Sequence, residues 1–171
     1  MNRGAKAAAA MFLYAAVMLG GGLVAYSLAP ETANARTALI VPVACAGAMV
    51  LSAILALQIP RSKVLGMIGI HAGLVLPLLF AAVIAWRAWG TGDAIDAFRA
   101  ADAAHAAAVA DGTSADTAAA RAEFFQAREA PDHDKSYLRN TLLFLAAASA
   151  GAFVLILSKR PPKSDRYPAA G

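Results

Sequence analysis

Residues 37–86 read TALIVPVACAGAMVLSAILALQIPRSKVLGMIGIHAGLVLPLLFAAVIAW. This stretch contains two runs without Asp, Glu, Lys or Arg, which are separated only by Arg61, Ser62 and Lys63. Because an α-helix rises about 1.5 Å per residue, each run is long enough to cross a hydrocarbon core of about 30 Å. Pro60 stops the first helix, and the connection is so short that the two helices must be antiparallel neighbours.

Two more uncharged runs flank this stretch, at residues 7–30 and 140–158. The four runs hold 24, 24, 23 and 19 of the 171 residues, so every charged side chain lies outside them. This pattern, with 60% hydrophobic and 15% charged residues, excludes a soluble globule, a disordered chain and a disulfide scaffold. The sequence therefore predicts an all-α integral membrane four-helix bundle, with spanning helices near residues 7–28, 37–59, 64–86 and 140–158.

The segment between the third and fourth runs has a different composition. Residues 91–135 are rich in alanine and acidic side chains, and they contain no apolar run long enough to enter the bilayer. We predict an extramembrane helical hairpin here. Its first helix is capped by Asp93 and ends at Asp111-Gly112, and its second is capped by Ser114 and ends at Pro131.

The chain accordingly divides into three parts. Residues 1–90 form the first three membrane helices, 91–138 form an extracytoplasmic hairpin insert, and 139–171 form the fourth helix and a basic tail. Trp86 and Trp89 are typical of the headgroup region, because indole has an apolar body and one hydrogen-bond donor, so they mark the outer interface. The first run exceeds the 7–15 or so apolar residues of a signal peptide, and we expect it to remain as a helix.

The distribution of Lys and Arg predicts the orientation. If four helices alternate in direction, one side of the membrane receives eight basic residues: Arg3, Lys6, Arg61, Lys63, Lys159, Arg160, Lys163 and Arg166. The other side receives Arg36 and six basic residues scattered among nine acidic ones in residues 87–139. By the positive-inside rule, both termini are cytoplasmic in a multi-pass protein of the cell inner membrane. The excess of positive charge then reflects orientation, and we expect membrane lipid as the partner and no nucleic acid.

Small residues are abundant in the predicted spans, and they allow helices to approach closely in lipid. Gly20-Gly21-Gly22 opens one side of the first helix, and Gly69 and Gly73 form a G-x-x-x-G pair in the third. Intramolecular packing is the simpler interpretation of these spacings, with a homodimer as the alternative. Pro77 removes one backbone donor in the middle of the third span, where a kink is expected.

His71 is the one ionisable His, Asp, Glu, Lys or Arg side chain within the four spans, which makes it a functional candidate. A neutral imidazole bonded to a neighbouring helix is the structural interpretation, and ligand binding or metal ligation are the alternatives. Asp132-His133-Asp134 resembles a fragment of a metal site, but three adjacent residues cannot all face one ion in regular structure. Catalytic and phosphate-binding motifs are absent from the sequence, which predicts no enzyme activity, no metal and no cofactor.

The first helix carries Tyr14-Ala15-Ala16, then Gly21-Gly22, then Tyr26. This arrangement resembles the transmembrane protein 14 family of small four-helix membrane proteins, in which a Tyr, a Gly pair and a second Tyr recur at this spacing. The resemblance continues into the second helix, which is also rich in small residues. It implies movement of lipophilic molecules, such as fatty acids or porphyrin precursors, across a membrane.

Two functions are compatible with these features. In the first, the bundle binds or passes a lipophilic molecule, fatty acid or porphyrin-like, through a groove left by its glycines. The residues expected to line this pathway are Gly21, Gly22, Gly69, Gly73, Tyr14, Tyr26 and His71, the last offering one hydrogen bond. In the second, the bundle is a non-transporting anchor and the outer hairpin docks a partner.

Overall fold

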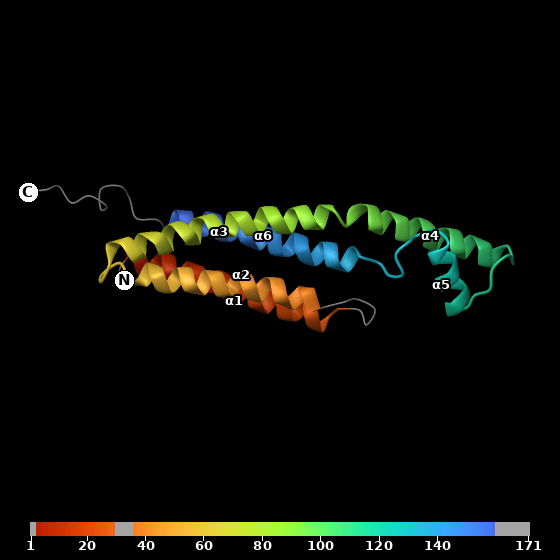
Figure 1. The fold of residues 1–171 in the computed structure, drawn as a ribbon, viewed down its shortest axis with the longest axis horizontal. Helices are drawn as coiled ribbons and strands as arrows, with labels where there is room; N and C mark the ends of the chain where they lie inside the picture. Colours follow the sequence, from red (N-terminus) through yellow and green to blue (C-terminus); the bar gives the residue numbers. More distant parts are fainter. Residues whose placement is uncertain (1–2, 30–35, 160–171) are drawn as a thin grey trace, which may run out of the picture.

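The computed structural model of the chain describes residues 3–29 and 36–159, and its secondary structure there is entirely helical (Figure 1). The helices are α1 (Arg3–Ser27), α2 (Arg36–Leu57), α3 (Lys63–Trp89), α4 (Gly92–Ala110), α5 (Ala118–Gln126) and α6 (Ser136–Ser158). Four segments are long and apolar enough to cross a membrane: Gly4–Ser27, Leu39–Leu57, part of Lys63–Ala110, and Ser136–Ser158. The predictions of an all-α chain and of four apolar helices of spanning length are therefore confirmed.

Helices α1, α2, α3 and α6 pack side by side in the order α1–α2–α3–α6 and back to α1, and α1 also contacts α3 across the group. The start of α1, the α2–α3 turn and the end of α6 lie at one end of this group of helices (Figure 1). The α2–α3 turn is tight because the Ser62 N–H donates to the Gln58 carbonyl at 2.8 Å, and the Ser62 hydroxyl then accepts from the Leu65 N–H. The expected antiparallel neighbours are thus formed by α2 and α3.

Glycines of α3 bring its backbone against α2. A Cβ atom added at Gly69 would lie 2.6 Å from the Ser52 carbonyl oxygen and closer still to the Ala56 nitrogen. One turn earlier, a Cβ at Gly66 would lie 2.8 Å from the Ile59 backbone. A Cβ atom added at Gly73 would overlap the Met11 side chain of α1. The prediction that small residues permit close packing within the chain is confirmed for this contact.

Helix α4 continues nearly in line with α3 and extends well beyond the ends of α1 and α2 (Figure 1). It begins after Thr91, not at a cap formed by Asp93, so that prediction is wrong. The Thr91 hydroxyl donates to the Ala88 carbonyl of α3 at 2.7 Å and makes no cap bond to α4. Asp93 lies instead in the first turn of α4, where its negative charge is favourable beside the positive end of the helix dipole.

Helix α4 ends at Ala110, as the Asp111-Gly112 pair predicts, and Gly112 has φ +70°. Ser114 does not cap the next helix, which corrects a second prediction. Its N–H donates to the Ala108 carbonyl at 3.0 Å, so Ser114 belongs to the C-terminal turn of α4. The cap of α5 is Thr117, whose hydroxyl accepts from the Ala120 N–H at 3.2 Å.

Helix α5 packs on α4 through a small core of its own. Ile95 and Phe125 are buried, and the Phe98 and Phe125 rings meet edge to face with centroids 5.5 Å apart. The Arg121 guanidinium lies 4.6 Å from the Phe125 ring centroid and 2.7 Å from the Asp102 carboxylate. The basic tail from residue 160 onward and the predicted end of the first helix at Pro30 lie outside the described residues.

Candidate lipophile-binding cleft

A cleft of about 490 Å³ lies between α1 and the first turns of α6. Its volume is within the range of about 300–1,000 Å³ that small-molecule sites occupy. The α1 wall is apolar, and the α6 wall mixes polar with aromatic side chains. The lining residues are Gly20, Gly21, Val24, Ala25 and Leu28 on α1, and Tyr137, Asn140, Thr141 and Phe144 on α6.

The polar end of the cleft lies at the start of α6. The Tyr137 hydroxyl donates to the Ala25 carbonyl of α1, which ties the two helices together at this level. Asn140, one turn further along α6, is exposed and makes no side-chain hydrogen bond with the rest of the described chain. Its amide is therefore free to bind the polar group of an amphipathic molecule.

The apolar end lies about two turns deeper, beside Gly20, Gly21 and Phe144. A Cβ added at Gly21 would lie 3.1 Å from the Phe144 ring and 3.4 Å from the Leu145 side chain. One added at Gly20 would meet no atom within 4 Å, so the space beside Gly20 is open. At 1.5 Å per residue, the distance along α6 from Tyr137 to Phe144 is about 10 Å.

The interior of the four packed helices is filled. Met11, Met18 and Met49 are fully buried between them. Tyr14 is also buried, and its hydroxyl lies 2.7 Å from the Ser149 hydroxyl of α6, which in turn donates to the Leu145 carbonyl. These contacts occupy the centre, so the open space for a ligand is at the side of the bundle.

The seven predicted pathway residues do not line one groove. Gly21 lines the cleft, but Gly22, Gly69 and Gly73 are buried in helix packing, and Tyr14 is held by Ser149. The physical reason is that the space beside a glycine on a helix surface is occupied by backbone or side-chain atoms of the next helix wherever the two helices can approach closely. Tyr26 is exposed outside the cleft.

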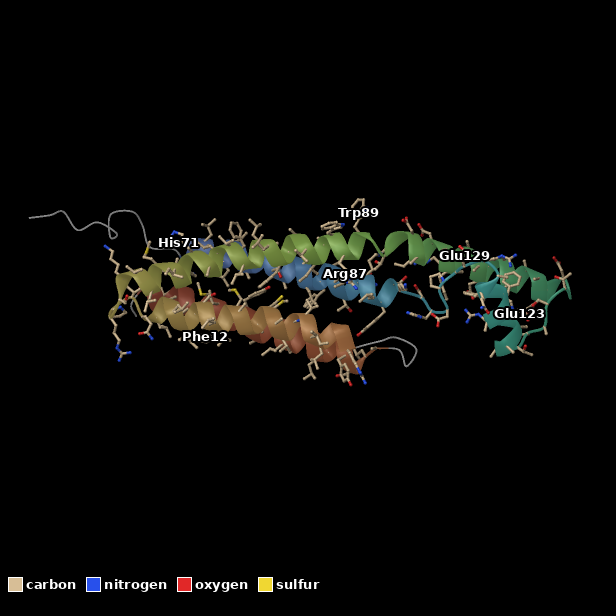
Figure 2. All side chains as sticks on the ribbon, viewed as in Figure 1. Phe12, His71, Arg87, Trp89, Glu123 and Glu129 are labelled. Atoms are coloured by element: carbon tan, nitrogen blue, oxygen red, sulfur yellow. The ribbon has the colours of Figure 1, made fainter. Side chains whose placement is uncertain are left out.

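His71 also lies elsewhere, on the outer face of α3 (Figure 2). Its Nδ1 is 2.7 Å from the Met67 carbonyl oxygen of the same helix. The predicted bond to a neighbouring helix is therefore wrong, because the preceding turn of α3 already supplies an acceptor. His71 is not among the residues that line the α1–α6 cleft.

Sequence reasoning missed most of the α6 wall. Tyr137, Asn140, Thr141 and Phe144 recur at i, i+3, i+4 and i+7, which places them on one helix face. The mixture of polar and aromatic side chains at this spacing was the available signal. It was obscured because the helix was expected to begin at Asn140, which left Tyr137 outside it.

The loop before α6 holds its acidic groups in local hydrogen bonds. His133 Nδ1 lies 2.5 Å from the Asp132 carboxylate, and this contact, with the charge of His133, lowers the pKa of Asp132. Hydrogen bonds from the Ser136 side chain and backbone N–H lower the pKa of Asp134. Within residues 3–29 and 36–159, no group of three or more His, Cys, Asp or Glu side chains is placed to hold a metal ion.

No protein-family model, curated protein sequence or solved structure shows a significant match to this chain. The resemblance of α1 to the transmembrane protein 14 family stays a prediction.

Proposed function

We propose that this chain is a multi-pass protein of the cell inner membrane, with cytoplasmic termini, that binds a lipophilic molecule in the α1–α6 cleft. The ligand class is fatty acid or porphyrin-like, with a polar group beside Asn140 and an apolar part beside Gly20. Binding is the first step of any passage across the membrane, and the resemblance to the transmembrane protein 14 family suggests such passage. The observation that carries the proposal is the cleft itself, which has open space beside Gly20 and the Tyr137–Ala25 hydrogen bond at its polar end.

The distribution of exposed apolar side chains supports a membrane location. Large apolar residues that are exposed in the isolated chain occur on all four long helices, for example Leu23, Ile54, Val75 and Val154. Such a belt is unfavourable in water and favourable in lipid. Among the described residues, the belt stops at Trp89, which is 87% exposed, and resumes at Leu143.

The interruption of the belt supports an extramembrane position for α4 and α5. Helix α4 carries Asp93, Asp96, Arg99 and Asp102 within three turns, and these charges are costly in a bilayer. Its 19 residues extend about 28 Å at 1.5 Å per residue, so the tip lies well beyond the interface marked by the tryptophans. The start of α1, with Lys6, and the end of α6, next to Lys159, lie at the end of the bundle opposite to α4 and α5 (Figure 1).

Filling the cleft tests the function. In Gly20→Leu, the new side chain has room at its Cβ and extends into the cleft, so it should occupy the ligand's space without disturbing the helix contact. We expect a loss of at least about tenfold in affinity for a photoactivatable fatty acid or for protoporphyrin, equivalent to about 1.4 kcal/mol. Native mass spectrometry of the detergent-extracted protein reports both bound ligand and subunit count.

Two variants serve as controls. Gly47→Leu adds the same side chain at a glycine of α2 that also has open space around its Cβ, and Gly47 does not line the cleft. His71→Ala removes the imidazole on the outer face of α3. Both should bind as the unaltered protein does. Equal loss of ligand in Gly20→Leu and Gly47→Leu would reject the cleft as the binding site.

The alternative function is a non-transporting anchor whose outer hairpin docks a partner. The projection of α4 and α5 beyond the bundle favours it (Figure 1). Deletion of residues 91–135 with a short linker distinguishes the two functions. If the cleft is the functional site, vesicles containing the deleted protein should retain lipophile binding within about twofold. The anchor interpretation is favoured if the unaltered protein binds no lipophile and the deletion removes only a co-purifying protein.

A further inference from the structure

A second hollow, of about 480 Å³, lies where α3 meets α4, beside the first turns of α6. It is separate from the α1–α6 cleft, because Lys135 and Leu138 face this hollow whereas Tyr137 and Thr141 face α1. The hollow lies at the level where the belt of exposed apolar side chains ends, and the highly exposed Trp86 is one of its lining residues. The hollow therefore lies at the proposed boundary between lipid and water.

Two positive charges line the hollow from different helices. Arg87 projects from the side of α3 that faces α6, and Trp89 points away from the bundle (Figure 2). Lys135, the residue before α6, lines the same hollow as Arg87. Neither Arg87 nor Lys135 has a carboxylate of the described residues within 4.0 Å.

Charged groups of both signs surround these two cations. Arg139 follows Lys135 by one turn on α6, and its buried Nε has no hydrogen-bond partner within the described part of the chain. Asp134 lies near Arg139 and accepts from the Ser136 N–H at 2.8 Å, and Lys135 helps to lower the pKa of Asp132. The first turn of α6 also presents the positive end of its helix dipole here.

Apart from Thr91, whose hydroxyl donates to the Ala88 carbonyl, the rest of the hollow is lined by apolar residues and Gly90. Val83 lies one turn before Arg87 on α3, and Leu138 lies one turn after Lys135 on α6, so both are closer than the cations to the middle of the long helices. A cationic rim above an apolar wall matches a phospholipid, whose phosphate lies directly above its acyl chains. A free phosphate ion would gain nothing from the apolar wall, so the arrangement favours a lipid as the source of the anion.

We propose that this hollow binds the phosphate headgroup of an anionic phospholipid, with Arg87 and Lys135 as its ligands and Val83 and Leu138 against its chains. The proposal rests on the membrane location proposed above and not on the α1–α6 cleft. Such a lipid would fill the gap between α3 and α6 at the level where the hairpin leaves the bundle.

Native mass spectrometry of the full chain in detergent, with equal amounts of phosphatidylglycerol and phosphatidylcholine, tests the proposal. The unaltered protein should prefer phosphatidylglycerol by about tenfold or more. Since each Lys or Arg near an anionic surface contributes about 1 kcal/mol, the double variant Arg87→Gln/Lys135→Gln should weaken phosphatidylglycerol binding about 10- to 30-fold. Arg87→Lys/Lys135→Arg keeps the charges and should keep the preference.

Two further controls make the result specific. Arg36→Gln/Arg61→Gln removes two basic residues that do not line the hollow and should leave the preference unchanged. Gly20→Leu should lose the lipophile and retain phosphatidylglycerol, which separates failure of this proposal from failure of the cleft. Equal binding of the two lipids, an unchanged preference in the Gln double variant, or displacement of the lipid by millimolar inorganic phosphate would each overturn the assignment.

Discussion

Gly69→Ala should destabilise the packed helices by about 3 kcal/mol or more, which is the largest effect expected for so small a change. The added methyl group would overlap the Ala56 nitrogen and the Ser52 carbonyl oxygen, which are backbone atoms of α2. A flexible side chain could move aside, but the backbone of a packed helix cannot do so without separating α2 from α3. Titration of the purified protein from mild detergent into dodecyl sulfate, followed by helix content, measures the free energy of unfolding.

Gly47→Ala is the matched control. It makes the same change in α2 at a position where the new Cβ meets nothing within 4 Å. Since alanine favours a helix over glycine by about 1 kcal/mol, this variant should be as stable as the unaltered protein or slightly more so. Similar unfolding curves for Gly69→Ala and Gly47→Ala would show that the close contact between α2 and α3 does not form.

The number and approximate positions of the long helices could be predicted because each is an uncharged run of 19 or more residues. Their ends were less predictable. Helix α3 continues through Arg87 to Trp89, and α6 begins at Ser136, because a charged residue can lie in a helix at or beyond the interface. The cap of α5 was assigned to Ser114 because a hydroxyl before an alanine run is a cap signal, and Thr117 gives the same signal three residues later.

The candidate cleft was less accessible to sequence reasoning. A helix that is apolar all round has no periodicity to indicate which face meets a neighbour, so His71 was assigned to the interior and lies outside. Gly21 was correctly recognised as a place for close approach, but which helix approaches it depends on packing that sequence spacing does not reveal. The Arg87–Lys135 pair is separated by 48 positions, and only the fold brings the two side chains to one hollow.

Phe125→Ala should release α5 from α4 and leave the four long helices unchanged. Removing a buried Phe side chain costs about 3–5 kcal/mol, and Phe125 is only 3% exposed. Helix α5 has nine residues, which is too short to be stable without packing. The remaining Arg121–Asp102 pair is about half exposed on each side, and such pairs contribute about 0–1 kcal/mol, so it should not hold α5 in place.

Hydrogen exchange followed by mass spectrometry tests this expectation. Amides of residues 118–126 should lose their protection in Phe125→Ala, whereas those of α6 should exchange as before. Glu123→Ala, which replaces an exposed side chain of the same helix, should leave α5 protected. Continued protection of α5 in Phe125→Ala would mean that the contacts of Arg121 with Asp102 and Phe98 of α4 are enough to hold α5 in place. Faster exchange throughout α6 would mean that the hairpin and the bundle unfold as one unit.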